Sequence, residues 1–322
     1  MRNARPAFAP LLATVAALAA SVLTGCSGGT GRPADAHGTT SAAQSTTTAA
    51  ATSDTGEPPA PKSSPPSPSS SASPPAKAPS GNATSASPGK ALWKPRPGLA
   101  WQWQLDGKAN PSADVPVYDI DGFENSAADV ARLHRDGRKV ICYINVGAWE
   151  DFRSDQGAFP RSVLGEPNGW AGERWLDIRQ VSVLRPIMER RFDMCRDKGF
   201  DAVEPDLVEG YGNDTGFPLT ARDQLRYNRM IAAIAHERGL SVGLKNDLPQ
   251  IPQLLADFDF AVNEECAQYD ECAELTPFIA AGKAVFHVEY TEPRSSFCPE
   301  SRRLKLSSMV KEPELGVWRK PC

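Results

Sequence analysis

The stretch Gly199–Tyr211, GFDAVEPDLVEGY, decides the expected fold. Residues 201–203 form a short predicted strand, which runs directly into Glu204, Asp206 and Glu209. In a parallel barrel the carboxyl end of each strand faces the mouth, where side chains converge on a ligand. Side chains alternate along a strand, so Glu204 and Asp206 lie on the same face. Taken alone, the segment also fits a solvated acidic loop.

The pattern of an apolar run followed by polar residues recurs along residues 92–322. Strands are predicted at 99–105, 115–120, 139–146, 175–178, 201–203, 241–244, 258–262 and 283–288. Helices are predicted at 126–136, 181–198 and 220–238, and a long polar loop at 149–170. Eight strands alternating with helices predict a single (β/α)8 TIM barrel in the α/β class.

Polar residues gather where these strands end. They are Asp119, Asp121, Asn145, Asp177, Glu204, Asp206, Asn246, Asp247, Asn263, Glu264 and Glu289. Burying unpaired charge is costly, so acids at most of the strand ends indicate one shared mouth. Structural caps and ion pairs with Arg185, Arg222 or Arg226 are the alternative for some of them.

The N-terminus has the pattern of a secretory signal. Arg2 and Arg5 precede an apolar run over 7–22, which is too short and too rich in Ala to favour a membrane-spanning helix. The following Leu-Thr-Gly-Cys resembles a bacterial lipobox, which implies that Cys26 is lipidated. Residues 1–26 are thus predicted to be a lipoprotein signal, with the mature protein anchored to the outer face of the cytoplasmic membrane. Ordinary cleavage that leaves Cys26 as a free thiol is the alternative.

Residues 27–91 are dominated by Ser, Thr, Pro, Ala and Gly. With almost no large apolar side chain, such a segment cannot offset its ordering entropy, and it is predicted to be a disordered tether. Residues 92–322 remain as the folded domain, which is long enough for one barrel.

The folded part is acidic. Residues 1–91 hold six basic and three acidic side chains, so residues 92–322 hold 29 Lys and Arg against 36 Asp and Glu, a charge of −7. This balance argues against a nucleic-acid partner and suits a cationic substrate. The chain has neither a P-loop nor a GxGxxG after a strand, so no nucleotide cofactor is expected.

Six cysteines follow Cys26, namely Cys142, Cys195, Cys266, Cys272, Cys298 and Cys322. An even number in an exported domain favours disulfides. Cys266 with Cys272 and Cys298 with Cys322 are the local pairings to try first, which leaves Cys142 with Cys195, although connectivity does not follow from sequence. Zinc is the competing interpretation, but the Cys-x-x-Cys and His-rich spacings of zinc sites are missing.

A ring of carboxylates suits the cleavage of an acetal. One protonated carboxyl gives a proton to the leaving oxygen, and one ionised carboxylate acts as nucleophile or activates water. Neighbouring acids hold one member protonated by repulsion and desolvation. Aromatic side chains could stack on sugar rings or simply pack: Trp101, Trp103, Tyr143, Trp149, Tyr211 and Tyr290.

Five segments in this order resemble glycoside hydrolase family 114, the endo-α-1,4-polygalactosaminidases. They are VYDIDGF (117–123), KVICYINVGAWE (139–150), GFDAVEPDLVEGY (199–211), GLKND (243–247) and AVNEEC (261–266). The likeness extends over about 92–318. It implies a secreted (β/α)8 barrel that cuts α-1,4-linked galactosamine polymers internally without a metal. A monomer without a cofactor is expected.

Carried over by position, the resemblance implies that Asp206 and Glu264 are the catalytic acids. Glu204 stays an alternative to Asp206, and Glu265 to Glu264, although alternation prevents Glu264 and Glu265 from both pointing inward. The family motif on the fifth strand often reads DPDN, and this chain departs from it at Glu204 and Leu207. Substrate contacts are expected from Asp119, Asp121, Tyr143, Glu204, Lys245, Asn246, Asn263 and Glu265, each of which also fits a structural role.

Two rival functions remain open. A lipid-anchored barrel that binds an amino-sugar polysaccharide without cutting it predicts the same acids and aromatics, but has no need of a matched acid pair. A metal-dependent phosphodiesterase barrel would need His and acid ligands together, and of four His only His287 lies near the predicted mouth.

Overall fold

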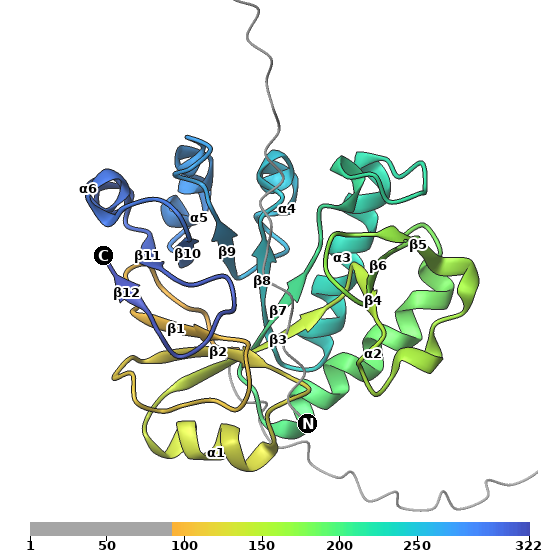
Figure 1. The fold of residues 1–322 in the computed structure, drawn as a ribbon, viewed down its shortest axis with the longest axis horizontal. Helices are drawn as coiled ribbons and strands as arrows, with labels where there is room; N and C mark the ends of the chain where they lie inside the picture. Colours follow the sequence, from red (N-terminus) through yellow and green to blue (C-terminus); the bar gives the residue numbers. More distant parts are fainter. Residues whose placement is uncertain (1–91) are drawn as a thin grey trace, which may run out of the picture. The chain divides into compact units, whose positions relative to one another are not determined.

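The computed structural model describes residues 92–322, and these form a mixed α/β fold around a curled sheet (Figure 1). The predicted signal, Cys26 and the predicted tether lie outside the described residues. Along residues 92–322, no helix is both long and apolar enough to cross a bilayer.

The sheet has nine strands in the order β1-β2-β3-β7-β8-β9-β10-β11-β12, parallel except for the β11–β12 pair. Eight parallel strands in sequential order match a TIM-like barrel. The strands are β1 (Trp101–Gln104), β2 (Val117–Asp121), β3 (Lys139–Asn145), β7 (Ala202–Asp206), β8 (Ser241–Lys245), β9 (Phe260–Glu264), β10 (Val285–Glu289), β11 (Ser307–Val310) and β12 (Lys320–Pro321).

The two faces of the sheet carry separate apolar clusters, because side chains alternate along each strand. The inner cluster includes Trp101, Trp103, Phe260, Phe286 and Met309. The outer cluster packs the strands against the helices. The inner face therefore has an apolar floor, above which the strands end in acids.

The helices are α1 (Ala127–Arg135), α2 (Val181–Lys198), α3 (Ala221–Glu237), α4 (Ile251–Leu254), α5 (Thr276–Ala280) and α6 (Arg294–Leu304). Figure 1 shows them on the outer side of the sheet. Ser126 and Thr220 cap α1 and α3 through capping boxes, and Gly199, at φ 90°, ends α2. The three predicted helices are confirmed. Single turns of 3₁₀ helix lie at Gln156–Ala158, Arg161–Val163, Gly210–Gly212, Leu248–Gln250 and Cys272–Leu275.

One predicted barrel strand is wrong in its placement. Trp175 and Leu176 belong to β6 (Glu173–Leu176), in a separate antiparallel sheet of order β4-β6-β5. Its other strands are β4 (Ala148–Glu150) and β5 (Leu164–Pro167), and all of their residues except Ala148 lie in the stretch predicted to be a loop. A short apolar run does not reveal its partner, which is why sequence periodicity placed it in the barrel.

The eighth parallel strand is β11, which the sequence pattern missed. Its residues, SSMV, are half polar, so they carry a weak strand signal. The count of eight was correct because one misplaced strand offset one missed strand. Next to β11, the Trp101 indole donates to the carbonyl of Ser307 at 2.8 Å, and Leu105 N donates to the carbonyl of Leu315 at 3.0 Å.

Three disulfides brace the domain, and all three predicted pairings are confirmed. Cys142–Cys195 ties β3 to α2, Cys266–Cys272 closes the loop after β9, and Cys298–Cys322 ties the C-terminus to α6. Each of these links constrains the unfolded chain, and such a disulfide typically stabilises the folded state by roughly 2–4 kcal/mol.

Candidate active site

Two strands, β7 and β9, bring their acids to a lysine on β8, which lies between them. Lys245, the last residue of β8, places its ammonium 2.8 Å from Asp206 Oδ1, 3.0 Å from Glu264 Oε2 and 3.3 Å from Glu204 Oε1. The lysine side chain is 2% exposed. A buried cation among three carboxylates holds them together in spite of their mutual repulsion.

Two tyrosines complete the arrangement. The Tyr143 hydroxyl donates to Asp206 Oδ2 at 2.6 Å, and the Tyr290 hydroxyl donates to Glu264 Oε1. Each of these two acids thus receives one donor from a tyrosine and one from Lys245, a symmetrical environment that fixes both carboxylates in orientation.

The acids differ in access to solvent. The side chains of Asp206 and Glu264 are 15% and 25% exposed, whereas Glu204 and Asp119 have no exposed surface. Only the first two could touch a bound substrate without a rearrangement. For Asp119 and Glu204, the predicted substrate contact would require a fully buried side chain to become exposed.

Local backbone contacts position the pair. The carbonyl of Asp206 accepts from Val146 N and Gly147 N at 3.1 and 3.2 Å. A Cβ on Gly147 would lie 1.7 Å from the carbonyl oxygen of Leu207, so only glycine allows this close approach. On β9, the side chain of Asn246 accepts from Glu264 N at 3.0 Å, which places Asn246 in a supporting role.

The lysine sets the charge of its neighbours. Burial would raise the pKa of Asp206, but Lys245 and the hydrogen bonds to this carboxylate outweigh it and hold the pKa below its ordinary value. Burial would lower the pKa of Lys245, but Asp206, Glu264 and Glu204 raise it well above its usual range. Asp206 is therefore ionised and Lys245 charged at neutral pH.

Further acids near the mouth were missed as site residues. Burial, then repulsion from Asp206, raises the pKa of Glu209 to about 8, and burial raises that of Glu173 to about 7. Burial also raises the pKa of Asp247 to about 7. Glu209 and Asp247 stand in the quoted motifs, but Glu173 arrives through the small antiparallel sheet and gives no sequence signal.

Some predicted mouth residues point elsewhere. Asp121 pairs with Arg153 at 2.6 Å and Asp177 with Arg179 at 2.7 Å. Asn263 donates to Asn246 at 3.2 Å from the outer side of β9, and Glu265, at φ 63°, lies just past the end of the strand, where alternation no longer applies. Asp121 and Asp177 thus each pair with an arginine, and neither contacts Lys245.

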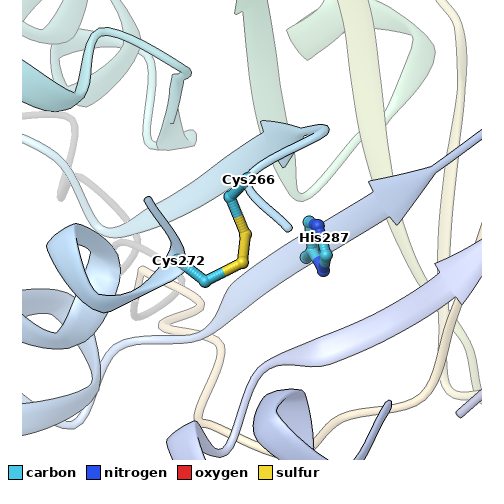
Figure 2. A group of neighbouring side chains, drawn as sticks. All are labelled: Cys266, Cys272 and His287. Carbon is cyan, nitrogen blue, oxygen red and sulfur yellow. A yellow bond between two sulfur atoms is a disulfide. The ribbon is translucent and has the colours of Figure 1, made fainter. Parts of the chain in front are cut away.

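The outer side of β10 holds His287 and Glu289, which alternate with the inward Phe286 and Val288. Their side chains bond to each other at 2.7 Å. Figure 2 shows His287 beside the Cys266–Cys272 disulfide, the one group of described residues with metal-ligand spacing. Zinc binds thiolates, and here both sulfurs are joined to each other, so this group is a structural one.

Comparison with known proteins shows which family and which solved structures the chain is similar to. The profile of glycoside-hydrolase family GH114 matches residues 82–322. The crystal structure of Aspergillus fumigatus Ega3 in complex with galactosamine is 38% identical, with a TM-score of 0.68 over 72% of this chain and 98% of that one. The glycoside hydrolase domain of PelA from Pseudomonas aeruginosa, 15% identical with a TM-score of 0.54 over 68% and 97% of the two chains, shares the fold. None of the curated proteins matches the chain.

Proposed function

The chain belongs to glycoside hydrolase family 114, and from this premise we propose that it cuts galactosamine-containing polysaccharide internally, with Asp206 and Glu264 as its catalytic pair. The observation that carries the proposal is the shared lysine. Asp206 and Glu264 are the two solvent-accessible members of the acid cluster, and both are held in orientation by Lys245 and a tyrosine. The curled sheet is, in this proposal, a (β/α)8 barrel with these acids at its mouth.

The spacing of the pair favours retention of the anomeric configuration. One lysine nitrogen contacts Asp206 Oδ1 at 2.8 Å and Glu264 Oε2 at 3.0 Å, so these oxygens are no farther apart than the sum of the two distances. That limit falls short of the roughly 6.5–9.5 Å that inverting enzymes keep open for a water molecule. A covalent glycosyl intermediate on one of the two acids fits this spacing.

The hydrogen bonds support a division of roles between the two acids. Asp206 is kept ionised by Lys245 and Tyr143, as a nucleophile must be. Glu264, the more exposed member, is assigned as the acid and base: it holds the proton that goes to the leaving oxygen, becomes a carboxylate, and takes a proton back from the water that releases the product. Lys245 offsets the negative charge of the pair and leaves Asp206 free to attack.

The charge around the mouth suits an amine-bearing polymer. Within the described residues, Lys245 is one cation among the carboxyl groups of Asp206, Glu264 and Glu204. Glu173, Glu209 and Asp247, whose pKa values are raised to about 7, 8 and 7, add carboxyl groups that become charged near or above neutral pH. Galactosamine residues are cationic, and an acidic mouth would attract them. The galactosamine in the Ega3 complex supports the same substrate class.

The deciding experiment measures reducing ends released from partly deacetylated α-1,4-galactosaminan by residues 92–322. Asp206→Asn and Glu264→Gln should each abolish release while the melting temperature stays near that of the unmutated domain. Asp257→Asn, at the far end of the strands, is the matched control and should keep full activity. Binding without release by the unmutated domain would instead support the binding-module alternative.

Two product measurements test the mechanism. Proton NMR of the first product should show the α-anomer before mutarotation, and a β-anomer would reject retention. Glu264→Ala should still cleave an aryl galactosaminide with a good leaving group, since that group needs no proton, whereas Asp206→Ala should not.

For location, we propose that the protein is a surface lipoprotein anchored through Cys26. The proposal rests on the Leu-Thr-Gly-Cys motif. Cys26→Ser should abolish incorporation of labelled palmitate in cells; labelling that persists in this variant would contradict it.

A further inference from the structure

Two acids lie beneath the catalytic pair on the inner face of the sheet, on two strands with β3 between them. Asp119 of β2 and Glu204 of β7 are both fully buried. The Trp103 indole donates to Glu204 Oε2 at 3.0 Å, and Lys245 lies 3.3 Å from Glu204 Oε1. Both oxygens of Asp119, by contrast, find no donor among the described residues. The two buried acids therefore differ sharply in their environment.

Ionising both acids at the same time would cost a large free energy. A fully buried carboxylate with no donor is among the most costly groups that a protein can hold, and a second carboxylate beside it adds repulsion. Glu204 has a cation and an indole to stabilise its charge, and Asp119 has neither. If the two acids share one proton, it therefore binds to Asp119, whose hydroxyl then becomes a hydrogen-bond donor.

We propose that Asp119 is a carboxylic acid whose hydroxyl donates to Glu204, and that this pair positions Lys245 between the catalytic acids instead of contacting substrate. The position of the proton does not depend on the proposed function. The positioning role does, because its test measures catalytic activity. It makes Asp119 and Glu204 positioning residues, one step removed from the reacting atoms.

The groups that face Asp119 support this assignment. Burial, then the charge of Glu204 and a hydrogen bond to it, raises the pKa of Asp119 well above its ordinary value, while Lys245 lowers it and Asp206 raises it. Burial also raises the pKa of Glu204, but Lys245 and the bond from Asp119 oppose that rise. The neutral acid is therefore Asp119, and Glu204 keeps the charge that anchors Lys245.

The pair has a consequence for catalysis. Ionised Asp119 would add a fourth carboxylate around one lysine and would favour protonation of Asp206, which removes the nucleophile. Neutral Asp119 avoids this repulsion, and its hydroxyl stabilises the Glu204 carboxylate. Lys245 then stays fixed between Glu204 below and the catalytic pair above.

Infrared difference spectroscopy tests the proton directly, without any need for activity. The spectrum of the unmutated domain minus Asp119→Asn at pH 7 should contain the carbonyl band of a protonated carboxylic acid. Only carboxylate bands in that difference would overturn the proposal. This result stands even if the domain cleaves no substrate, which would count against the proposed function alone.

Activity variants test the positioning role. An Asn amide can donate to Glu204 as the acid does, so Asp119→Asn should keep kcat within about threefold and leave the acid limb of the pH profile in place. Asp119→Ala removes the donor and should lower kcat by roughly 10- to 100-fold, with the acid limb moved to higher pH. Melting temperatures separate this loss from unfolding. If Asp119→Asn lost as much activity as Asp119→Ala while staying folded, the donor role would be rejected.

Discussion

Lys245 Nζ lies 2.8 Å from Asp206 Oδ1, and the same nitrogen contacts Glu264 Oε2 at 3.0 Å from the other side. The lysine is the last residue of β8, between the strands that carry the two acids. One buried cation thus sets both the spacing and the charge of the pair. The first prediction concerns what happens when this charge is removed.

Replacing Lys245 with Met should lower kcat by roughly 100-fold or more, because an electrostatic group at the reacting centre is lost. It should also move the acid limb of kcat/KM to higher pH. Lys245 holds the pKa of Asp206 down, so without it Asp206 takes up a proton at a higher pH. The measurement is a pH profile of galactosaminan cleavage.

The control for this change is Lys283→Met. Lys283 donates to backbone carbonyls of Leu255 and Phe258, at the opposite end of the strands. Its profile should match that of the unmutated domain. An acid limb that stays in place in Lys245→Met would contradict the role given to the lysine.

Replacing Tyr143 with Phe should lower kcat by roughly 10- to 100-fold with little change in KM. The hydroxyl donates to Asp206 Oδ2 at 2.6 Å, and a hydrogen bond to a charged group contributes roughly 1.5–3 kcal/mol. Steady-state kinetics separates the two constants. Tyr118→Phe loses a buried hydroxyl that bonds to Ala113 O on the outer face, and it should leave both constants unchanged. Equal losses in the two variants would mean that the effect is one of packing.

Glu209 should make the domain less stable as pH rises. Its pKa is raised to about 8 by burial and then by Asp206, against an ordinary value of roughly 4.3 in the unfolded chain. Between these values the folded state binds more protons, so the free energy of unfolding falls as pH rises, by at most about 1.4 kcal/mol per pH unit for this group. The stability that this group contributes is fully present below its pKa in the unfolded chain, and it is lost as the pH rises to about 8.

Urea unfolding at several pH values between about 5 and 8 measures this slope. Glu209→Gln should flatten it, because the amide does not titrate. Glu237→Gln, an exposed glutamate of α3, should leave the slope as it is. If the slope in Glu209→Gln equals that of the unmutated domain, another group is responsible.

Arg191 should matter for stability far more than its neighbour Arg190. The Arg191 guanidinium is buried and contacts Asp155 Oδ2 at 2.8 Å and Glu150 Oε2 at 3.2 Å. Arg191→Met leaves Asp155 without this cation and leaves Glu150 with Arg153 alone, and it should cost roughly 3–5 kcal/mol. The exposed Arg190, changed to Met, should alter stability by no more than about 0.5 kcal/mol. Urea unfolding compares the two, and equal losses would reject the argument from burial.

The predicted α/β class is confirmed, although one strand was misplaced and another was missed. Strands such as β3 and β8 were recognisable because parallel strands buried on both faces read as apolar runs. The 175–178 run has the same appearance, but it pairs antiparallel within the small sheet, and SSMV of β11 is too polar to stand out. Pairing partners are long-range contacts, and local composition does not encode them.

Local patterns in the sequence determined the helix caps at Ser126 and Thr220, the alternation that separates Glu264 from Glu265, and the gathering of acids at strand ends. These depend on residues near one another in the chain. The tertiary structure alone decided which acids share Lys245, which are buried beneath it and which turn to other partners. Burial and charge pairing depend on side chains about 40 to 100 positions apart in sequence, as in Lys245 with Asp206 and Trp103 with Glu204, and only the folded sheet brings these together.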